Sequence, residues 1–329
     1  MPQRRLPSSR GRRVLVALGI VLTGCATTKP LMAVNVSLTD LRSQPHTVAA
    51  PVIHDPLEET QLLYGELVTV VKTQEGWSYV EAIEQPERTH ENRWQGYPGW
   101  VPTSALTLWQ PLMTPTIIVT ERWAPTWRDS YRTTSAPWHF SLGTRLRATD
   151  MAGQLWKVEL LNGETVWMLH KDAQPLGELM ALPNLEKRRA ILRHAQLFLG
   201  DPYYWGGRSP HTTTLNDQVT GVDCSGLVNL AYRAAGVDIP RDAHEQFLRA
   251  KPVKAVQPGD LIFLSERHNP KHISHVMLYA GDGEVIEAPG TGLAVRRIAL
   301  KQRLGQSLDW LAPGAVVEDQ TLFFGTYLQ

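Results

Sequence analysis

The stretch GVDCSGLVNLAYRAAG, residues 221–236, places one of the chain's two cysteines at the start of a predicted helix. Asp223 is a suitable N-cap, the apolar residues from Leu227 onward have helical spacing, and Gly236 is a typical stop. Cys224 then lies on the first turn, where backbone amides and the helix dipole stabilise a thiolate and can hold an oxyanion. The stretch predicts a nucleophile, although a buried, unreactive cysteine also fits it.

A second stretch, HISHVMLYAGDGEVIEAPG at residues 272–290, predicts a β-hairpin that turns at residues 281–283. A two-residue loop would put His275 and Glu287 on opposite faces of the hairpin. A three-residue loop pairs residue 277 with Glu287 and makes His275 and Glu287 diagonal neighbours on one face. We expect the three-residue loop, which gives a nucleophile, a base and an orienting carboxylate in Cys224, His275 and Glu287.

The N-terminal residues 1–24 have the pattern of a secretory signal peptide, with five arginines before a short apolar run at 14–22. That run is much shorter than the roughly 20 residues of a membrane-spanning helix. LTGC at residues 22–25 resembles a bacterial lipobox, which implies a lipid anchor on Cys25; an ordinary signal peptide with an incidental cysteine is the alternative. Ala26 resembles the sorting pattern for the outer membrane of a Gram-negative cell, so we expect an exported lipoprotein on its periplasmic face.

Composition narrows the possible functions. The formal net charge is +1, and no basic block follows residue 13, which argues against nucleic-acid binding. A lipid on Cys25 would leave Cys224 without an intramolecular disulfide partner, as expected for a reactive thiol or an intermolecular link. Cys and His residues do not cluster at short spacing, so we expect neither a metal site nor a cofactor.

The chain divides into segments of different character. Residues 25–45 are mixed in composition and predict a tether. Residues 46–110 are rich in Val, Trp and Tyr and predict the short strands of a small barrel, and 115–178 repeat this pattern. Trp77 and Trp100 of the first copy then correspond to Trp156 and Trp167 of the second. Residues 185–329 predict a third domain, so the expected fold class is α+β.

The third domain resembles the NlpC/p60 family of cell-wall cysteine peptidases, which have a papain-like fold. The motifs that carry the resemblance are GDPYYWGG, VDCSGLV, IPRDAHEQ, QPGDLIFL, SHVMLYAG and VIEAPG, in family order. The resemblance implies that Cys224 is the nucleophile, His275 the base and Glu287 the third polar residue. Glu287 departs from the family pattern, in which the third position is most often His. Residues 46–110 and 115–178 resemble bacterial SH3-like barrels.

Two SH3-like barrels before the peptidase domain resemble the γ-D-glutamyl-L-diamino acid endopeptidases. The resemblance implies hydrolysis of the γ-D-glutamyl–diamino acid bond of murein stem peptides, with preference for a free N-terminal L-alanine. Tyr203, Asp223 and Ser225 match substrate-pocket positions of that subgroup, whereas Ala243 stands where a serine is common. We expect Asp223 to meet the ammonium of the L-alanine, although a helix cap alone explains this residue equally well. We also expect the first barrel to cover one end of the cleft and to contribute Tyr97.

Two other functions remain open. The chain could be a non-catalytic wall-binding adaptor, in which the SH3-like pair binds and the third domain is degenerate. The Cys–His site could instead serve an acyltransferase or another amidase, because water and amine acceptors use the same acyl-enzyme.

Overall fold

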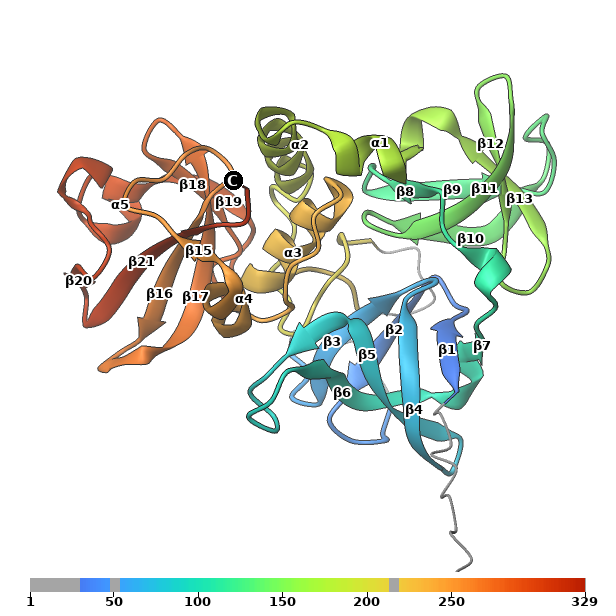
Figure 1. The fold of residues 1–329 in the computed structure, drawn as a ribbon, viewed down its shortest axis with the longest axis horizontal. Helices are drawn as coiled ribbons and strands as arrows, with labels where there is room; N and C mark the ends of the chain where they lie inside the picture. Colours follow the sequence, from blue (N-terminus) through green and yellow to red (C-terminus); the bar gives the residue numbers. More distant parts are fainter. Residues whose placement is uncertain (1–29, 48–53, 213–218, 329) are drawn as a thin grey trace, which may run out of the picture.

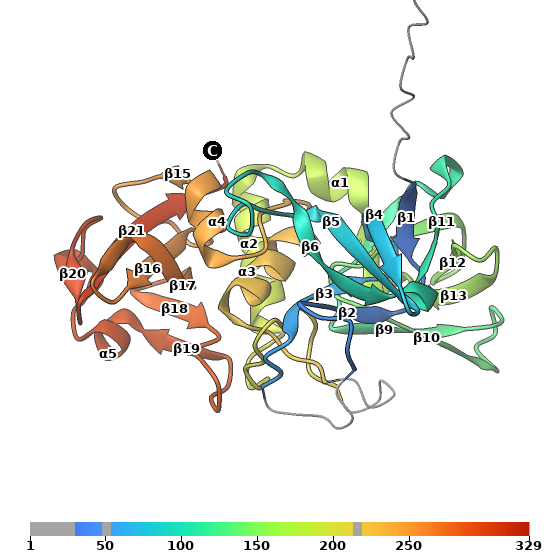
Figure 2. The same cartoon turned by 90° about the horizontal axis from the view of Figure 1, so that it is seen from below.

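The computed structural model describes residues 30–47, 54–212 and 219–328. They form two antiparallel β domains and a third domain in which helices pack on an antiparallel sheet, so the predicted α+β class is confirmed. Helices α2 (Asn184–Gln196) and α3 (Cys224–Ala234) stand between the third domain's sheet and the two β domains (Figure 1). Figure 2 shows the same arrangement after a quarter turn.

The first domain is a seven-stranded sheet in the order β3-β2-β6-β5-β4-β1-β7. Its strands are β1 (Leu31–Val34), β2 (Leu38–Arg42), β3 (Glu58–Leu63), β4 (Leu67–Gln74), β5 (Trp77–Glu87), β6 (Gln95–Pro102) and β7 (Leu106–Leu108). Along β5, half-buried and buried residues alternate from Trp77 to Ala82, as expected for a strand with one face on a core. Val80 and Ala82 of this strand lie in the domain's apolar core with Leu41 and Leu62.

The prediction of a tether over residues 25–45 is wrong from residue 31 onward. β1 pairs with β4 and β7, and β2 pairs with β3 along its whole length, so this segment is part of the first domain's sheet. Both strands are only four or five residues long, too short to give the sequence a clear period of two. Residues 25–29, the signal-peptide segment and Cys25 lie outside the described residues.

The second domain repeats the topology of the first, strand for strand, with the order β10-β9-β13-β12-β11-β8-β14. Its strands are β8 (Ile117–Val119), β9 (Trp123–Trp127), β10 (Ser135–Ser141), β11 (Arg145–Ala152), β12 (Leu155–Glu159), β13 (Thr165–Leu169) and β14 (Ala173–Pro175). Trp100 pairs with Tyr79, and Trp167 pairs with Lys157. This register equates Trp77 with Leu155, so the predicted match of Trp77 to Trp156 is off by one residue.

The third domain follows the short helix α1 (Leu176–Ala181). Its sheet has the order β15-β21-β16-β17-β18-β19, and β20 pairs with β21. The strands are β15 (Lys251–Pro252), β16 (Leu261–Glu266), β17 (Asn269–Gly281), β18 (Glu284–Glu287), β19 (Arg296–Ala299), β20 (Val316–Val317) and β21 (Gln320–Thr326). Helices α2 and α3 share one apolar core with this sheet; α4 (Ala243–Arg249) follows α3, and α5 (Leu300–Leu304) packs into a second core.

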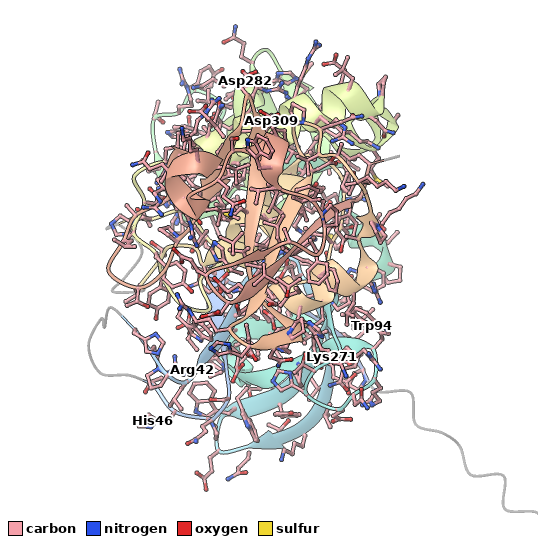
Figure 3. All side chains as sticks on the ribbon, turned by 90° about the vertical axis from the view of Figure 1, so that its left-hand side faces the viewer. Arg42, His46, Trp94, Lys271, Asp282 and Asp309 are labelled. Carbon is pink, nitrogen blue, oxygen red and sulfur yellow. The ribbon has the colours of Figure 1, made fainter. Side chains whose placement is uncertain are left out.

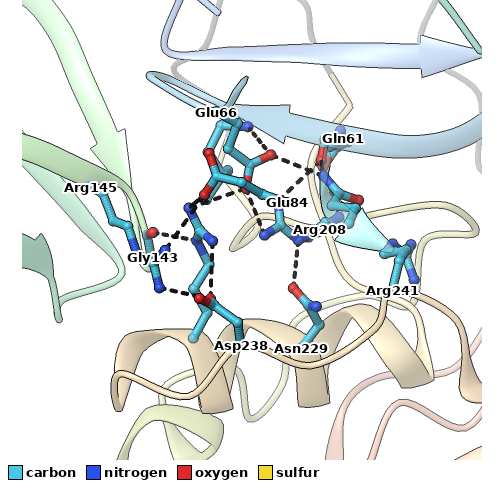
Figure 4. Close-up of polar contacts among 12 residues, drawn as sticks. Gln61, Glu66, Glu84, Gly143, Arg145, Arg208, Asn229, Asp238 and Arg241 are labelled. Carbon is cyan, nitrogen blue, oxygen red and sulfur yellow. Dashed lines mark hydrogen bonds and ion pairs between the residues drawn. The ribbon is translucent and has the colours of Figure 1, made fainter. Parts of the chain in front are cut away.

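Two buried arginines join the three domains at α3 through ion pairs and a hydrogen bond (Figure 4). Arg233 near the end of α3 contacts Glu84 of the first domain at 2.7 Å, and its Nε donates to the Gly143 carbonyl of the second domain. Arg208, in the loop before α3, contacts Glu66 of the first domain at 2.8 Å. Both arginines are almost fully buried, so their charges depend on these partners. The first domain is therefore anchored against the helix that begins at Cys224.

Within the described residues, no helix is long and apolar enough to cross a membrane.

Candidate active site

Helix α3 begins at Cys224, with Asp223 as its N-cap, as the sequence predicts. The Gly226 amide donates to Asp223 Oδ1 at 2.7 Å, and the Leu227 amide donates to the Asp223 carbonyl. These bonds leave the amides of Cys224 and Ser225 as the first-turn donors for an oxyanion. Position 226 accepts no side chain, because a Cβ there would lie 2.3 Å from the Gly207 carbonyl oxygen. The close approach of that loop fixes the start of the helix.

The β17–β18 hairpin carries His275 and Glu287. Leu278 pairs with Ile286 and Tyr279 with Val285, which is the predicted register and confirms that His275 and Glu287 share a face. The expected three-residue loop is wrong in detail. Gly281 pairs with Glu284, so only two residues form the turn, and the ladder shifts by one residue between Tyr279 and Gly281.

A two-residue turn alone would pair Leu278 with Glu287. The bulge shifts the pairing by one residue, so Leu278 pairs with Ile286, as the three-residue loop would also have required. The two turn residues, Asp282 and Gly283, both have positive φ, +53° and +74°, as a type I′ turn requires. Figure 3 shows Asp282 at one end of the third domain and Lys271, in β17, toward the other. The long strand β17 thus places His275 well away from the turn.

His275 and Glu287 are in direct contact. His275 Nε2 lies 2.8 Å from Glu287 Oε2, which leaves Nδ1 for the hydrogen bond between His275 and Cys224. Burial favours the neutral imidazole, but the bonds to Cys224 and Glu287 outweigh it and raise the pKa of His275 to about 9. Burial likewise opposes ionisation of Glu287, yet His275, Arg303 and Arg296 lower its pKa to about 2. The geometry favours a thiolate–imidazolium pair held by an ionised carboxylate.

Arg296 and Arg303 were not identified from the sequence. Arg296 lies directly across from Glu287 in the β18–β19 pair, so extending the strand register by one strand would have found it. Arg303 comes from α5, and no local pattern connects that helix with the hairpin.

Asp223 and Ser225, both predicted to line the substrate pocket, are bound to Arg241. This arginine is fully buried, and its guanidinium donates to both carboxylate oxygens of Asp223, at 3.0 and 2.7 Å, and to Ser225 Oγ at 2.9 Å. Its Nε donates to Thr60 Oγ1 of the first domain at 2.7 Å. The charge of Asp223 is therefore already compensated in the absence of substrate. Arg241 stands in the IPRDAHEQ motif, but its role was not predicted.

Tyr97 lies where the first domain meets the third. Its hydroxyl donates to Asp242 Oδ2 at 3.0 Å, and Tyr97 is close enough to Glu59 of β3 to lower the pKa of that carboxylate. Burial raises the pKa of Asp242 to about 7, and the nearby Glu245 and Asp223 act in the same direction against Arg241 and Tyr97. Burial also raises the pKa of Glu59. Tyr97, Asp242 and Glu59 thus form an acidic group at the domain junction.

Tyr203 is close to both the helix cap and the thiol. It forms a backbone bridge with Val222, and burial, followed by the charges of Asp223 and Cys224, raises the pKa of its phenol. The structure therefore gathers the predicted residues Tyr97, Tyr203, Asp223, Cys224, Ser225, His275 and Glu287 around the start of α3 and the hairpin. Residues 213–218 of the loop before α3 lie outside the described residues.

This arrangement can perform acyl transfer. A thiolate at the start of α3 attacks a carbonyl, the amides of Cys224 and Ser225 receive the oxyanion, and His275 protonates the leaving amine. Among the described residues, no three His, Cys, Asp or Glu side chains converge as metal ligands would.

Comparisons with known proteins agree with this chemistry. Residues 200–307 match the model of the NlpC/P60 family. A γ-D-glutamyl-L-lysine dipeptidyl-peptidase of Bacillus cereus is 31% identical over 74% of this chain and 70% of its own length. The Bacillus subtilis protein of the same name is 30% identical over 76% of this chain and 78% of its own length.

The likeness extends to the three-dimensional structure. The crystal structure of an NlpC/P60 family protein from Bacillus cereus superimposes with a TM-score of 0.73 at 25% identity, covering 91% of this chain and all of that one. Since the superposition spans both β domains and the third domain, the two molecules share their domain arrangement as well as the fold of each domain.

Proposed function

The chain belongs to the NlpC/P60 family of cysteine peptidases, and from this premise we propose that it hydrolyses the γ-D-glutamyl–diamino acid bond of peptidoglycan stem peptides that have a free N-terminal L-alanine. The observation that carries the proposal is the acidic group of Tyr97, Asp242 and Glu59, beside the thiol-bearing helix. The two Bacillus relatives are named for the γ-D-glutamyl-L-lysine bond and as dipeptidyl-peptidases. Such an enzyme must recognise an N-terminus two residues from the bond it cuts.

The acidic group suits a substrate ammonium. Asp242 and Glu59 are partly exposed, and their cationic partners lie further away, Arg241 at 3.7 Å and His90 at 3.9 Å. Asp223, in contrast, is bound to Arg241 through both oxygens at 3.0 and 2.7 Å. An ammonium that leaves water needs a carboxylate that can still approach it closely, because an unpaired buried charge costs several kcal/mol. We therefore assign the ammonium to Asp242 and Glu59, and keep Asp223 as the cap that fixes Cys224 and borders the pocket.

The reaction follows from the proposed roles of Cys224 and His275. The Cys224 thiolate attacks the γ-carbonyl of D-glutamate, and the amides of Cys224 and Ser225 stabilise the oxyanion. The imidazolium of His275 gives its proton to the diamino acid's amine, which leaves as the C–N bond breaks. His275 then takes a proton from water, the resulting hydroxide opens the thioester, and the dipeptide and free thiol are released.

Product analysis tests the proposal. Purified protein is incubated with L-Ala-γ-D-Glu-L-Lys and with the diaminopimelate analogue, and the products are identified by mass spectrometry. We expect L-Ala-D-Glu and the free diamino acid from the wild type, and neither product from Cys224→Ala with an unchanged circular dichroism spectrum. Hydrolysis by Cys224→Ala, or transfer to an added amine without hydrolysis, would contradict the proposal. Binding to sacculi with no turnover would favour a non-catalytic adaptor.

We further propose that a lipid on Cys25 holds the protein to the periplasmic face of the outer membrane. The support is the LTGC sequence at residues 22–25 after a basic and apolar N-terminus. Cys25→Ser should move the protein from the membrane fraction to the soluble fraction without changing its specific activity. Cys25→Ser that stays with membranes washed in high salt would show that another anchor exists.

A further inference from the structure

Glu287 is shared by three cationic side chains. It has no exposed surface, and besides His275 Nε2 it accepts hydrogen bonds from Arg296 Nη2 at 2.7 Å and Arg303 Nε at 3.1 Å. Arg296 adds a second bond through its Nε at 3.0 Å, so it approaches one oxygen of Glu287 with two donors. Apart from the bond to His275, every hydrogen bond that the Glu287 carboxylate accepts from the described residues thus comes from Arg296 or Arg303.

The two arginines come from separate elements that follow the hairpin. Arg296 lies directly across from Glu287 on β19. Arg303 lies in the last turn of α5, and Leu300 and Leu304 of the same helix are buried in the core on that side of the sheet. Because α5 is anchored by these leucines, it presents Arg303 to Glu287 from a fixed position.

We propose that Arg296 and Arg303 are positioning residues for catalysis: they orient the Glu287 carboxylate toward His275 and take up part of its negative charge, so that the imidazolium still releases its proton to the leaving amine. The inference rests on the roles proposed above for Cys224, His275 and Glu287.

The charge balance gives the reason. A buried carboxylate 2.8 Å from an imidazole, with no other partner, would hold the proton on His275 too tightly for general acid catalysis. It would also tend to become protonated itself, since burial opposes its ionisation. Two guanidinium groups correct both effects, because they keep Glu287 ionised and weaken its pull on His275. A protonated histidine at position 287 would be repelled by the same two groups, which fits the presence of a glutamate here.

The groups that face His275 can be named from each neighbouring element. Cys224 of α3 lies on the Nδ1 side and Glu287 of β18 on the Nε2 side. β16 places the apolar Leu264 opposite His275 in the sheet. Arg296 and Arg303 act on His275 through Glu287. Helix α4 also packs against β17, but its His244 accepts a hydrogen bond from the Ile273 amide and stacks on His272. The titration of His275 therefore reports on the two arginines through Glu287.

The chain also provides a matched control. Arg297 follows Arg296 on the same strand, but it pairs with Glu284 at 2.7 Å, and both of these side chains are more than a third exposed. Arg297→Gln removes the same charge from the same strand without touching Glu287.

The experiment compares pH profiles from pH 5 to 10 for wild type, Arg303→Gln, Arg303→Lys, Arg296→Gln and Arg297→Gln. Two quantities are measured: kcat and KM on L-Ala-γ-D-Glu-L-Lys, and the rate at which iodoacetamide alkylates Cys224. We expect Arg303→Gln and Arg296→Gln to lower kcat about tenfold with little change in KM. Their upper limb should move to higher pH by about half a unit or more, because His275 then faces a less compensated carboxylate. Arg303→Lys should retain most of kcat, and Arg297→Gln should match wild type.

Profiles that keep the wild-type upper limb in both glutamine variants would overturn the inference, even if activity falls, because a merely structural loss lowers amplitude alone. If a glutamine variant does not fold, Arg303→Lys and the remaining variant are read in the same two assays. Failure of the proposed function can be distinguished from failure of this inference. If the wild type does not cut the peptide but the alkylation profiles still shift in the arginine variants, the proposed function is wrong and the positioning role stands.

Discussion

At the scale of single residues, the fully buried Glu287 links the proposed nucleophile and base to the rest of the domain. His275, whose pKa is raised to about 9, keeps its proton across the neutral range and can pair with a thiolate at Cys224. Above that value the imidazolium loses its proton and the thiolate loses its partner. Activity should therefore fall on the alkaline side as His275 deprotonates.

Substitution of Glu287 should move the alkaline limit of activity to lower pH, whereas loss of Arg296 or Arg303 should move it to higher pH. Glu287→Gln removes the negative charge that stabilises the imidazolium and leaves Arg296 and Arg303 facing it, so the upper limb of the pH–kcat profile should shift to lower pH. Gln can still accept a hydrogen bond from His275 and should keep partial activity, whereas Glu287→Ala should lose more. An unchanged rate and profile in both variants would mean that Glu287 does not act on His275.

Much of the site's chemistry was predictable from the sequence because it depends on local patterns. The cap at Asp223 and the position of Cys224 follow from the helical spacing of residues 221–236. The face shared by His275 and Glu287 followed only from the expected length of the loop. Arg241 and Arg303 were not predictable, since each reaches its partner from another element and a sequence gives no register between elements.

At the scale of elements, the start of α3 depends on how closely a loop approaches it. The Gly207 carbonyl packs where any side chain at position 226 would stand, and Arg241 joins this loop to the Asp223 cap. The hairpin shows a similar dependence on backbone detail. Its register matches the prediction for a different reason, because a two-residue turn and a bulge replace the expected three-residue loop. The bulge was not predictable, because residues 276–279 are all buried and β17 shows no hydrophobic alternation there.

Gly226→Ala should displace the first turn of α3. Its Cβ would lie 2.3 Å from the Gly207 carbonyl oxygen, so we expect a loss of about 1–3 kcal/mol in unfolding free energy and a lower kcat, measured by urea titration and peptide hydrolysis. The matched control is Gly177→Ala in α1, where a Cβ meets nothing within 4 Å and should leave kcat unchanged. Equal behaviour of the two variants would contradict the importance of this contact.

At the scale of the whole molecule, the first β domain is docked against the domain that carries the candidate active site. Thr60 and Gln61 of β3 bind Arg241 and Arg208, and Glu66 and Glu84 neutralise the buried arginines around α3. The tandem repeat and the α+β class were predictable from composition and repeated strand patterns. The sequence allowed the prediction that the first and third domains touch. It did not allow prediction of the residues that join them, because these lie more than 100 positions apart in the chain.

Glu66→Ala should therefore destabilise the first and third domains together. Arg208 would remain buried without its anion, at a cost of about 3–5 kcal/mol. We expect thermal loss of peptidase activity and of tryptophan fluorescence to shift down together. As a control, Glu159→Ala breaks a partly exposed pair with Arg147 and should cost at most about 1 kcal/mol. Loss of fluorescence at a lower temperature with no change in the thermal loss of activity would show that the domains are independent.

The most direct test is kcat/KM on L-Ala-γ-D-Glu-L-Lys and on its N-acetyl derivative, for wild type and Asp242→Asn. Acetylation removes the ammonium that we assign to Asp242 and Glu59, and should lower the wild-type value by at least about thirtyfold, or 2 kcal/mol. The test belongs above pH 7, where Asp242 is ionised, since its pKa is raised to about 7. Asp242→Asn should reduce the difference in kcat/KM between the two peptides, because it lowers kcat/KM on the free peptide. Equal wild-type rates on both peptides would contradict selection of a free N-terminus at the junction of the first and third domains.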